Sequence, residues 1–364
     1  MNVCIIGEGL TALSLAKSLI NKKINVHYYH KSRNSNFSSN RTIGISKSNF
    51  EFFKEKIFQI SKNNYWKINR IEIYTDKIDT ENLLKFENDK NDLFYIIKND
   101  ELLKSLNSNL IKSKFFKKII LSKNINEEFL NKKEYDLIIN CDANNFLAKK
   151  YFTKKISKNY YNLAYTTILK HKKIENNTAT QIFTKQGPIA FLPISSTETS
   201  VVYSIDIKNK KFDNSDVIDL INKNNPKYLI NKIDKLNSFE LSSSNLRNYY
   251  HKNILAFGDM LHRVHPLAGQ GFNMTIRDLR ILTKIIEDKI ELGMQLDSQI
   301  FDEFEKKTKD KNFVFSKAID LIYESFNLDK KVQNKSFSKI LKSIGKNKNL
   351  NNYFIKLADA GINF

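Results

Sequence analysis

The pattern of apolar residues near the N-terminus predicts a βαβ unit. Residues 2–6 form a continuous apolar run, which is typical of a buried parallel strand. Apolar residues then recur at helical spacing over residues 10–21, and residues 24–29 form a second strand. Gly7 and Gly9 lie in the turn between the first strand and the helix. This order of strand, glycine turn, helix and strand indicates a sheet with parallel strands.

The apolar pattern changes twice further along the chain. Residues 50–60 and 99–110 have helical spacing, and residues 135–141 form another continuous apolar strand. Short strands separated by turns follow and predict a mostly antiparallel sheet, at residues 161–169, 178–183, 189–194 and 200–207. The pattern then predicts a strand, a glycine-rich loop and a helix, at residues 253–257, 258–273 and 274–291, with a lysine-rich helical tail beyond about residue 310.

We therefore predict one discontinuous α/β domain that is interrupted by a β-rich insert. The α/β domain comprises residues 1–73, 96–156 and 246–330. The insert, a mostly antiparallel β-sheet domain, comprises residues 74–95 and 157–245, and a helical segment, residues 331–364, follows. The pattern shows no internal repeat.

Glycine and proline are scarce, and most of them gather in three places. The chain has only 10 glycines and 4 prolines. The clustered ones are Gly7, Gly9, Gly187, Pro188, Pro193, Gly258, Pro266, Gly269 and Gly271. Glycine adopts backbone conformations that other residues avoid, and the ring of proline fixes its φ angle. We therefore expect special backbone geometry in these three segments.

The net charge of +21 changes this picture little. The lysines are spread along the whole chain between asparagines and isoleucines, so we read them as a compositional bias and do not expect a nucleic-acid partner. The alternative interpretation of this charge is attraction of the protein to an anionic membrane surface. No apolar run reaches the ~18–20 residues that a spanning helix needs. We expect no signal peptide, because residues 3–6 follow no basic region or cleavage site. We expect a cytoplasmic protein, with a peripheral position on the inner face of the membrane as the alternative.

Cys4 and Cys141 each lie in an apolar strand-like run. We expect buried thiols in a reducing compartment, because their spacing fits no pattern of metal ligands. We expect no metal site.

The segment Gly7-x-Gly9-x-x-Ala12 has the spacing of a dinucleotide-binding turn. The first glycine makes the tight turn, the second lets the backbone approach a pyrophosphate, and the small third residue allows close packing of helix on strand. The N–H groups at the start of the helix, which include those of Leu10 and Thr11, would face the phosphates.

One part of the dinucleotide signature is missing. An acidic residue normally ends the second strand and binds the adenosine ribose, but His30 occupies that place. A neutral imidazole accepts one hydrogen bond where a carboxylate accepts several. His30 and Lys31 also suit a 2′-phosphate, so this motif alone leaves both FAD and NADP open.

The segment from Gly258-Asp259 to His265-Pro266-Leu267-Ala268-Gly269-Gln270-Gly271-Phe272-Asn273 decides between them. It resembles the GDAAH and HPxxGQGxN motifs of the flavoprotein aromatic hydroxylases, the p-hydroxybenzoate-hydroxylase-like FAD monooxygenases. The resemblance implies a Rossmann-like FAD-binding domain. It implies that Asp259 accepts bonds from the ribityl hydroxyls and that Pro266 packs beside the isoalloxazine ring. Gly269, Gly271, Phe272 and Asn273 would bring backbone N–H groups to the pyrimidine end of the flavin, which becomes negative on reduction.

Other candidate residues are assigned with less specific signals. His262 and His265 have no cysteine or carboxylate nearby in sequence, so we expect turn-forming and packing roles. Arg41 resembles the family arginine that reaches the FAD phosphates. Asp142 resembles the acid of the family's strand-end ADG motif, which is otherwise degraded, and would contact FAD or order the pyrophosphate loop.

Residues 179–193 resemble one branch of this family, the UbiH/UbiF-type hydroxylases of ubiquinone biosynthesis. Tyr160-x-Asn162-x-Ala164 and residues 354–361 resemble that branch more loosely. By this resemblance Leu192 and Pro193, together with His265 and Pro266, line the active site below the β-sheet domain. No catalytic base is predicted, because the flavin performs the oxygen chemistry.

The resemblance implies hydroxylation of a polyprenylated phenol or quinol precursor in ubiquinone biosynthesis. NAD(P)H, bound transiently, would reduce FAD, and O2 would react to form a flavin C4a-hydroperoxide. Two alternatives are a flavin monooxygenase with a soluble aromatic substrate and a non-catalytic scaffold in a quinone-biosynthesis complex. Residues 337–344 have the pattern of an amphipathic helix on a membrane surface, or of a helix that packs on its own domain.

Overall fold

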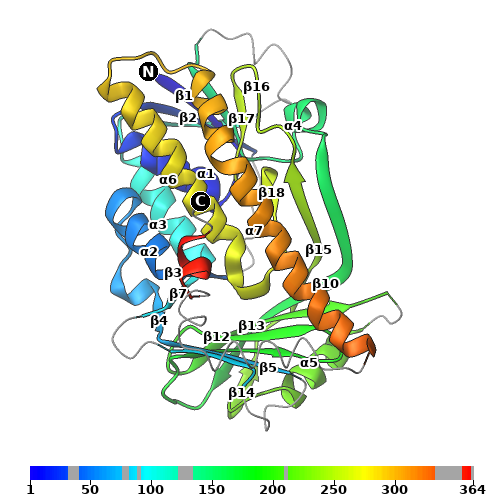
Figure 1. Cartoon of the computed structure of the whole chain (residues 1–364). Helices are drawn as coiled ribbons and strands as arrows, with labels where there is room; N and C mark the ends of the chain where they lie inside the picture. Colours follow the sequence, from blue (N-terminus) through cyan, green and yellow to red (C-terminus); the bar gives the residue numbers. More distant parts are fainter. Residues whose placement is uncertain are drawn as a thin grey trace.

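The computed structural model describes residues 1–31, 41–75, 82–87, 92–121, 134–208, 212–332 and 355–361. Figure 1 shows a helix-covered part above a sheet-rich part, with the long helix α7 (Gln299–Val332) running along both. The amphipathic segment expected at residues 337–344 lies outside the described residues. Among those that are described, no helix combines the length and the apolar content needed to cross a bilayer.

The predicted parallel sheet is confirmed. Its strands, in spatial order, are β16 (Tyr250–His251), β17 (Ile254–Ala256), β9 (Leu137–Asn140), β1 (Asn2–Ile6), β2 (Asn25–Lys31) and β8 (Phe116–Leu121). All neighbours are parallel except β16 with β17. The helices packed with it include α1 (Leu10–Ile20), α3 (Asn99–Ile111), α4 (Phe146–Tyr151), α6 (Gln270–Glu291) and the first half of α7. Val3 to Ile6 are fully buried, which explains the uninterrupted apolar run at residues 3–6.

The predicted mostly antiparallel sheet is also confirmed. Its strands, in spatial order, are β18 (His262–Arg263), β15 (Asn237–Leu246), β10 (Lys155–His171), β13 (Glu198–Asp206), β12 (Pro188–Pro193), β11 (Thr178–Phe183), β5 (Arg70–Thr75) and β6 (Leu84–Glu87). In the described residues β14 (Ile230–Ile233) also pairs with β10, and α5 (Asn214–Lys223) precedes it. Only β5 and β11 are parallel neighbours here.

A small third sheet lies between these two parts, with the order β3 (Thr42–Ser46), β7 (Phe94–Lys98) and β4 (Trp66–Ile68). The helix expected at residues 50–60 begins earlier, as α2 (Lys47–Phe52), and continues as a π-helical turn (Phe53–Ile57) before a 3-10 turn (Lys62–Asn64). Strand β5 crosses the domain boundary that the sequence predicts after residue 73.

Two features join the large sheet to the α/β part. Strand β10 is 17 residues long and pairs with β15 along most of its length. Strand β18 belongs to the glycine-rich segment at residues 258–273, and it pairs with β15 through Ser244 opposite Arg263 and Asn245 opposite His262. The segment that the sequence singles out is therefore itself an edge of the second sheet.

A substitution at Gly187 tests how closely strands of the second sheet pack at this position. Its φ is 147°, and an added Cβ would lie 1.9 Å from the backbone oxygen of Ser204. We expect Gly187→Ala to lower the free energy of unfolding by at least about 3 kcal/mol, since the clash is with backbone that cannot rotate away.

Gly293→Ala is the matched control, because Gly293 has a φ of 68° but no atom near its Cβ position. It should cost only about 1 kcal/mol, the strain of a left-handed conformation. Urea unfolding of both variants measures the difference, and equal losses would contradict the assigned packing of Gly187.

Candidate cofactor and substrate site

The N-terminal turn is shaped by two glycines with different surroundings. An added Cβ at Gly7 would lie 2.9 Å from the Cβ of Cys141, so Gly7 lets the turn pass the end of β9. Gly9 begins α1 with a φ of 97°, and apart from its own helix and chain neighbours no atom of the described residues lies within 4 Å of its Cβ position. The open space in front of the helix N-terminus therefore has room for a phosphate group.

At the end of β2, the His30 ring has a buried nitrogen with no hydrogen-bond partner among the described residues. Its Nδ1 lies 2.9 Å from the backbone oxygen of Lys31, which can only accept, so Nδ1 has the proton. Its Nε2 is therefore an acceptor, and it is buried without a hydrogen-bond partner among the described residues. An unpaired buried acceptor at this place fits a ribose hydroxyl as donor, in the role that a carboxylate usually has.

Lys31 and Asp142 form an ion pair of 3.1 Å at the ends of β2 and β9. The other oxygen of Asp142 accepts a hydrogen bond of 2.8 Å from the backbone N–H of Asn144. Asp142 thus forms a hydrogen bond within its own loop, which fits one of the two roles predicted for it. Its ion pair with Lys31 also neutralises the lysine that a 2′-phosphate would bind. Arg41 is exposed just before β3, and its contact with the FAD phosphates stays a prediction.

The beginning of the glycine-rich segment lies against the first turn of α1. Gly258 has a φ of 69°, and an added Cβ would lie 2.5 Å from the Cγ2 atom of Thr11. The two glycine motifs, which are about 250 residues apart in the chain, therefore meet in space, with Asp259 exposed directly after the contact. This is the arrangement that one cofactor bound by both motifs requires.

Helix α6 begins at Gln270, four residues before the position that the sequence predicts. The prediction that the loop extends to residue 273 is wrong. Gly269 adopts the left-handed conformation at φ 63°, which lets the helix begin directly after it. Gly271 and Phe272 therefore lie in the first helical turn, whose N–H groups have no partner within the helix. Beyond its own helix, no atom in the described part of the chain lies within 4 Å of the Cβ position of Gly271, so this turn faces open space there.

Asn273 is fully buried, and all of its side-chain hydrogen-bonding capacity is used within the protein. Its Nδ2 donates to the backbone oxygens of Gly44, at 2.9 Å, and of Gly269, at 3.1 Å. Its Oδ1 accepts from the backbone N–H of Ser46 at 2.9 Å and from Asn49 Nδ2 at 3.2 Å. The side chain thus fastens α6 to β3, and a contact of Asn273 with the cofactor would use its backbone.

His262 has a carboxylate partner, which corrects the expectation from sequence. Its Nε2 lies 2.5 Å from Asp278 Oδ2 on α6, and Asn312 Nδ2 donates to the other oxygen of Asp278 at 2.9 Å. The sequence gives no sign of this pair, since 16 residues separate its members. Within the described part of the chain, no cluster of three or more metal-ligating side chains exists. The packing role expected for His262 stays a prediction.

His265 is 1% exposed and belongs to a cluster at the junction with the second sheet. Its ring stacks on Tyr323 with centroids 4.2 Å apart and meets Tyr160 edge-on at 4.9 Å. Its Nε2 lies 3.3 Å from Ser204 Oγ on β13. Burial, with a smaller contribution from Lys158, lowers the pKa of His265 to about 3, so the ring is neutral.

Leu192 and Pro193 lie on β12, at the side of the second sheet that adjoins β3. Leu192 is opposite Ser200 on β13, whose Oγ accepts a hydrogen bond of 2.8 Å from Thr42 Oγ1 on β3. Since Gly44 of β3 lies against Gly269, this edge of the sheet is close to the start of α6. The assignment of Leu192, Pro193 and the half-buried Pro266 to the active site stays a prediction.

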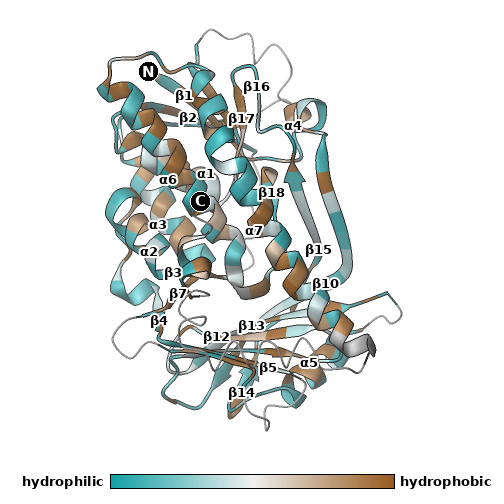
Figure 2. Cartoon of the chain, viewed as in Figure 1, coloured by the Kyte–Doolittle hydropathy of each residue, from teal (hydrophilic) through white to brown (hydrophobic). Residues whose placement is uncertain are grey.

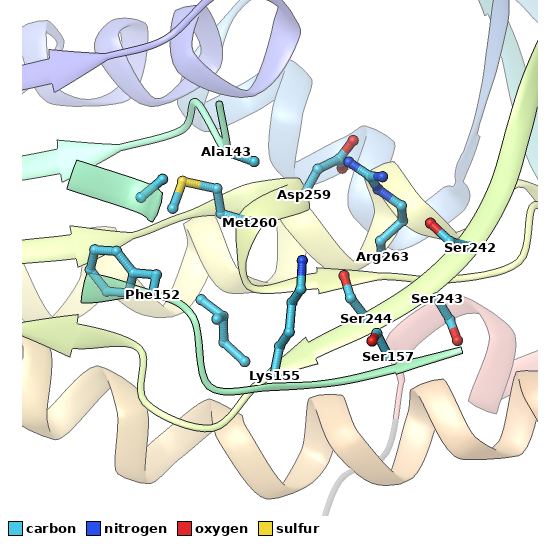
Figure 3. Close-up of a pocket in the computed structure, with 12 residues that line it drawn as sticks. Ala143, Phe152, Lys155, Ser157, Ser242, Ser243, Ser244, Asp259, Met260 and Arg263 are labelled. Carbon is cyan, nitrogen blue, oxygen red and sulfur yellow. The ribbon is translucent and has the colours of Figure 1, made fainter. Parts of the chain in front are cut away.

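A cavity of about 120 Å³ lies beside Asp259, between the α/β part and strands β10 and β15 (Figure 3). Lys155 and Arg263 point into it, and neither forms an ion pair with another described residue. The other polar lining residues are the carboxylate of Asp259 and the hydroxyl groups of Ser157, Ser242, Ser243 and Ser244. Two cations and several hydroxyl groups suit an anionic group such as a phosphate.

The geometry of Gly271 predicts a separation of folding from cofactor binding. Gly271→Val should leave the free energy of unfolding of the FAD-free protein within about 1 kcal/mol of wild type, because the side chain enters open space. It should abolish retention of FAD, because the valine would occupy the place of the ligand. Flavin absorbance after gel filtration measures this. Retention equal to wild type would refute the placement of the cofactor.

The low pKa of His265 predicts a pH dependence of stability. The unfolded state binds a proton near pH ~6.5, whereas the folded state does so near 3. Stability is therefore fully present above pH ~6.5 and is lost as the pH falls. Between about pH 7.5 and 5.5, wild type should lose about 1.4 kcal/mol more than His265→Gln, as measured by urea unfolding. Parallel losses would show that His265 is accessible to protons in the folded protein.

Comparison with known proteins agrees with this geometry. The model of an FAD binding domain matches residues 160–305, which include Gly258 to Asn273. The mitochondrial ubiquinone biosynthesis monooxygenase COQ6 of Caenorhabditis elegans is 25% identical over 197 residues, covering 43% of this chain and 44% of that protein. The 3-demethoxyubiquinol 3-hydroxylase of Escherichia coli (strain K12) is 26% identical over 153 residues, covering 40% and 39%. The matched region thus spans less than half the length of either relative.

The crystal structure of p-nitrophenol 4-monooxygenase PnpA from Pseudomonas putida DLL-E4 superposes with a TM-score of 0.77 at 12% identity, covering 100% of this chain and 98% of that chain. At this identity the likeness shows the fold alone. Together with the open, glycine-lined space and the free acceptor of His30, the matches fit FAD as the cofactor. Residues 160–305 therefore match an FAD binding domain, the chain has the fold of FAD-dependent monooxygenases, and ubiquinone-biosynthesis monooxygenases are among its relatives in sequence.

Proposed function

We propose that this protein hydroxylates the aromatic ring of a polyprenylated phenol or quinol precursor in ubiquinone biosynthesis, with FAD, NAD(P)H and O2. The observation that supports this most is the meeting of Gly258 with Thr11, which brings both glycine motifs to one open space. The names of the two relatives, a ubiquinone biosynthesis monooxygenase and a demethoxyubiquinol hydroxylase, support the substrate class.

The residues on the two sides of this space would hold the two ends of FAD. The start of α1 at Gly9 would bind the pyrophosphate, and His30 Nε2 would accept a hydrogen bond from the adenosine ribose. The first turn of α6 at Gly271 and Phe272 would hold the pyrimidine end of the flavin, where a helix N-terminus stabilises negative charge. When bound, FAD supplies the activation of O2 and its transfer to the ring.

The surroundings of Pro266 favour an apolar substrate. The next residue, Leu267, is buried in an apolar cluster with Leu241 of β15 and Phe315, Ile319 and Phe326 of α7. His265 contributes a neutral ring to the same region. A site bordered in this way excludes water and suits an aromatic ring with a prenyl tail better than a charged aromatic acid.

The cavity with Lys155 and Arg263 is our candidate for the phosphates of NAD(P)H. It lies beside Asp259, which the sequence assigns to the flavin, so a reductant held there would be close to the cofactor. Because the cavity is lined by side chains and has no dinucleotide fold of its own, it favours transient binding.

Isotope labelling tests the proposed reaction. The FAD-loaded protein is incubated with NADH or NADPH, a short-chain prenylphenol and heavy-isotope O2, and the product is analysed by mass spectrometry. We expect one labelled oxygen atom in the ring, more efficiently with the prenylphenol than with the same phenol lacking the tail. Gly271→Val should give no product.

Two outcomes would count against this function. Oxidation of NAD(P)H with release of hydrogen peroxide and no ring oxygen would indicate a different substrate. Equal turnover of the phenol without its tail would favour the soluble-substrate alternative.

A further inference from the structure

The exposed residues of helix α7 change from charged to mainly apolar at Phe313. Before this point its exposed residues are charged, for example Lys306, Lys307 and Asp310. From this point on its exposed residues are mainly large and apolar: Phe313 is 38% exposed, Val314 42%, Leu321 63%, Ile322 40% and Leu328 58%. We call these five residues the α7 stripe.

The α7 stripe is continuous along the helix surface. Val314, Leu321 and Leu328 are spaced by seven residues, which places them almost in line on a helix with 3.6 residues per turn. Phe313 and Ile322 lie on either side of this line. Figure 2 shows brown segments in this half of α7, and Figure 1 shows that it runs beside β10 and β15.

The opposite face of the same half is already packed. Phe315, Ile319, Tyr323 and Phe326 are buried in the cluster that contains Leu267, the residue after Pro266. This part of α7 is therefore apolar on both faces. Since a helix at the surface of a globular protein is normally polar on its outer face, the α7 stripe indicates a second, apolar environment outside the protein.

The described charges around the α7 stripe are paired, and the sequence that follows the stripe is basic. Lys317 lies within the stripe, with its ammonium group 5.7 Å from the centre of the Phe313 ring and 3.5 Å from Asp320 Oδ2. The exposed acid on this face, Glu324, is paired with Lys158 of β10. In sequence, residues 330–346 contain six lysines and no acidic residue. An exposed apolar stripe that is followed in sequence by a lysine-rich segment, in a chain with a net charge of +21, complements the surface of an anionic bilayer.

We propose that the α7 stripe docks this protein on an anionic phospholipid bilayer, inserting its side chains at the level of the headgroups. The proposal rests on the function proposed above, in which the substrate has a lipid-like tail. It adds the surface by which the protein approaches the membrane, and it places one helix between the bilayer and the apolar cluster at Leu267. A prenyl tail would then have a short apolar path from the bilayer to the site.

Vesicle co-sedimentation of the full-length protein tests this proposal. The vesicles contain phosphatidylglycerol and phosphatidylcholine, or phosphatidylcholine alone. We expect wild type to bind the anionic vesicles and to bind the neutral ones more weakly. The variant Leu321→Glu/Ile322→Glu should bind the anionic vesicles roughly tenfold or more weakly, because it removes two apolar contacts and adds two negative charges.

The matched control is Ile111→Glu/Leu292→Glu. It exchanges the same residue types for the same charges at positions that are 57% and 74% exposed on other elements. It should bind anionic vesicles within about twofold of wild type, and the flavin spectra of both variants should match that of wild type. A general effect of lower net charge would instead weaken both variants equally.

Two results would overturn the proposal. One is equal binding by wild type and Leu321→Glu/Ile322→Glu. The other is no binding of wild type to anionic vesicles, as expected if another protein or residues 333–354 of this chain cover the α7 stripe. Neither result concerns the hydroxylation of a short-chain prenylphenol without vesicles, so failure of the docking surface and failure of the proposed reaction are distinguishable.

Discussion

The whole arrangement depends on how closely residues 258–273 approach three other parts of the chain. At one end Gly258 lies so near Thr11 that a methyl group would not fit. At the other end Asn273 uses every hydrogen bond of its amide, two of them to the backbone of β3. Between these ends β18 pairs with β15 of the large sheet. Because the segment is fixed at each point, it sets the position of the large sheet relative to the α/β part.

Buried polar pairs fix the position of residues 258–273, whose glycines give the backbone more conformational freedom. The pair of His262 with Asp278 connects it to α6, and Asn312 extends the connection to α7. His265 connects it to Ser204 of the large sheet. Buried polar groups of this kind are costly when one partner is lost, so they specify one arrangement. Helix α7 thus packs on this segment with its inner face, and its outer face has the apolar residues that we propose to dock on the membrane.

The sequence predicted the local elements well because local signals determine them. The uninterrupted apolar runs predict the parallel strands, and the clustered glycines indicate the two candidate cofactor motifs. The partner of His262 and the role of Asn273 could not be predicted, because Asp278 and Gly44 are distant in sequence and have no distinctive pattern. The sequence pattern predicts the start of α6 too late, since the helical spacing begins at Met274 whereas the left-handed Gly269 allows an earlier start. Likewise, only the hydrogen bond of its Nδ1 shows that His30 has a free acceptor.

The central claim is that the space between the two glycine motifs is a binding site for FAD rather than for NADP. The most direct measurement is the absorption spectrum of the purified protein, as isolated and after addition of FAD or NADP and gel filtration. The account predicts the bands of bound flavin, retained through the column, and no retention of NADP. A folded protein that stays colourless after incubation with FAD would contradict it.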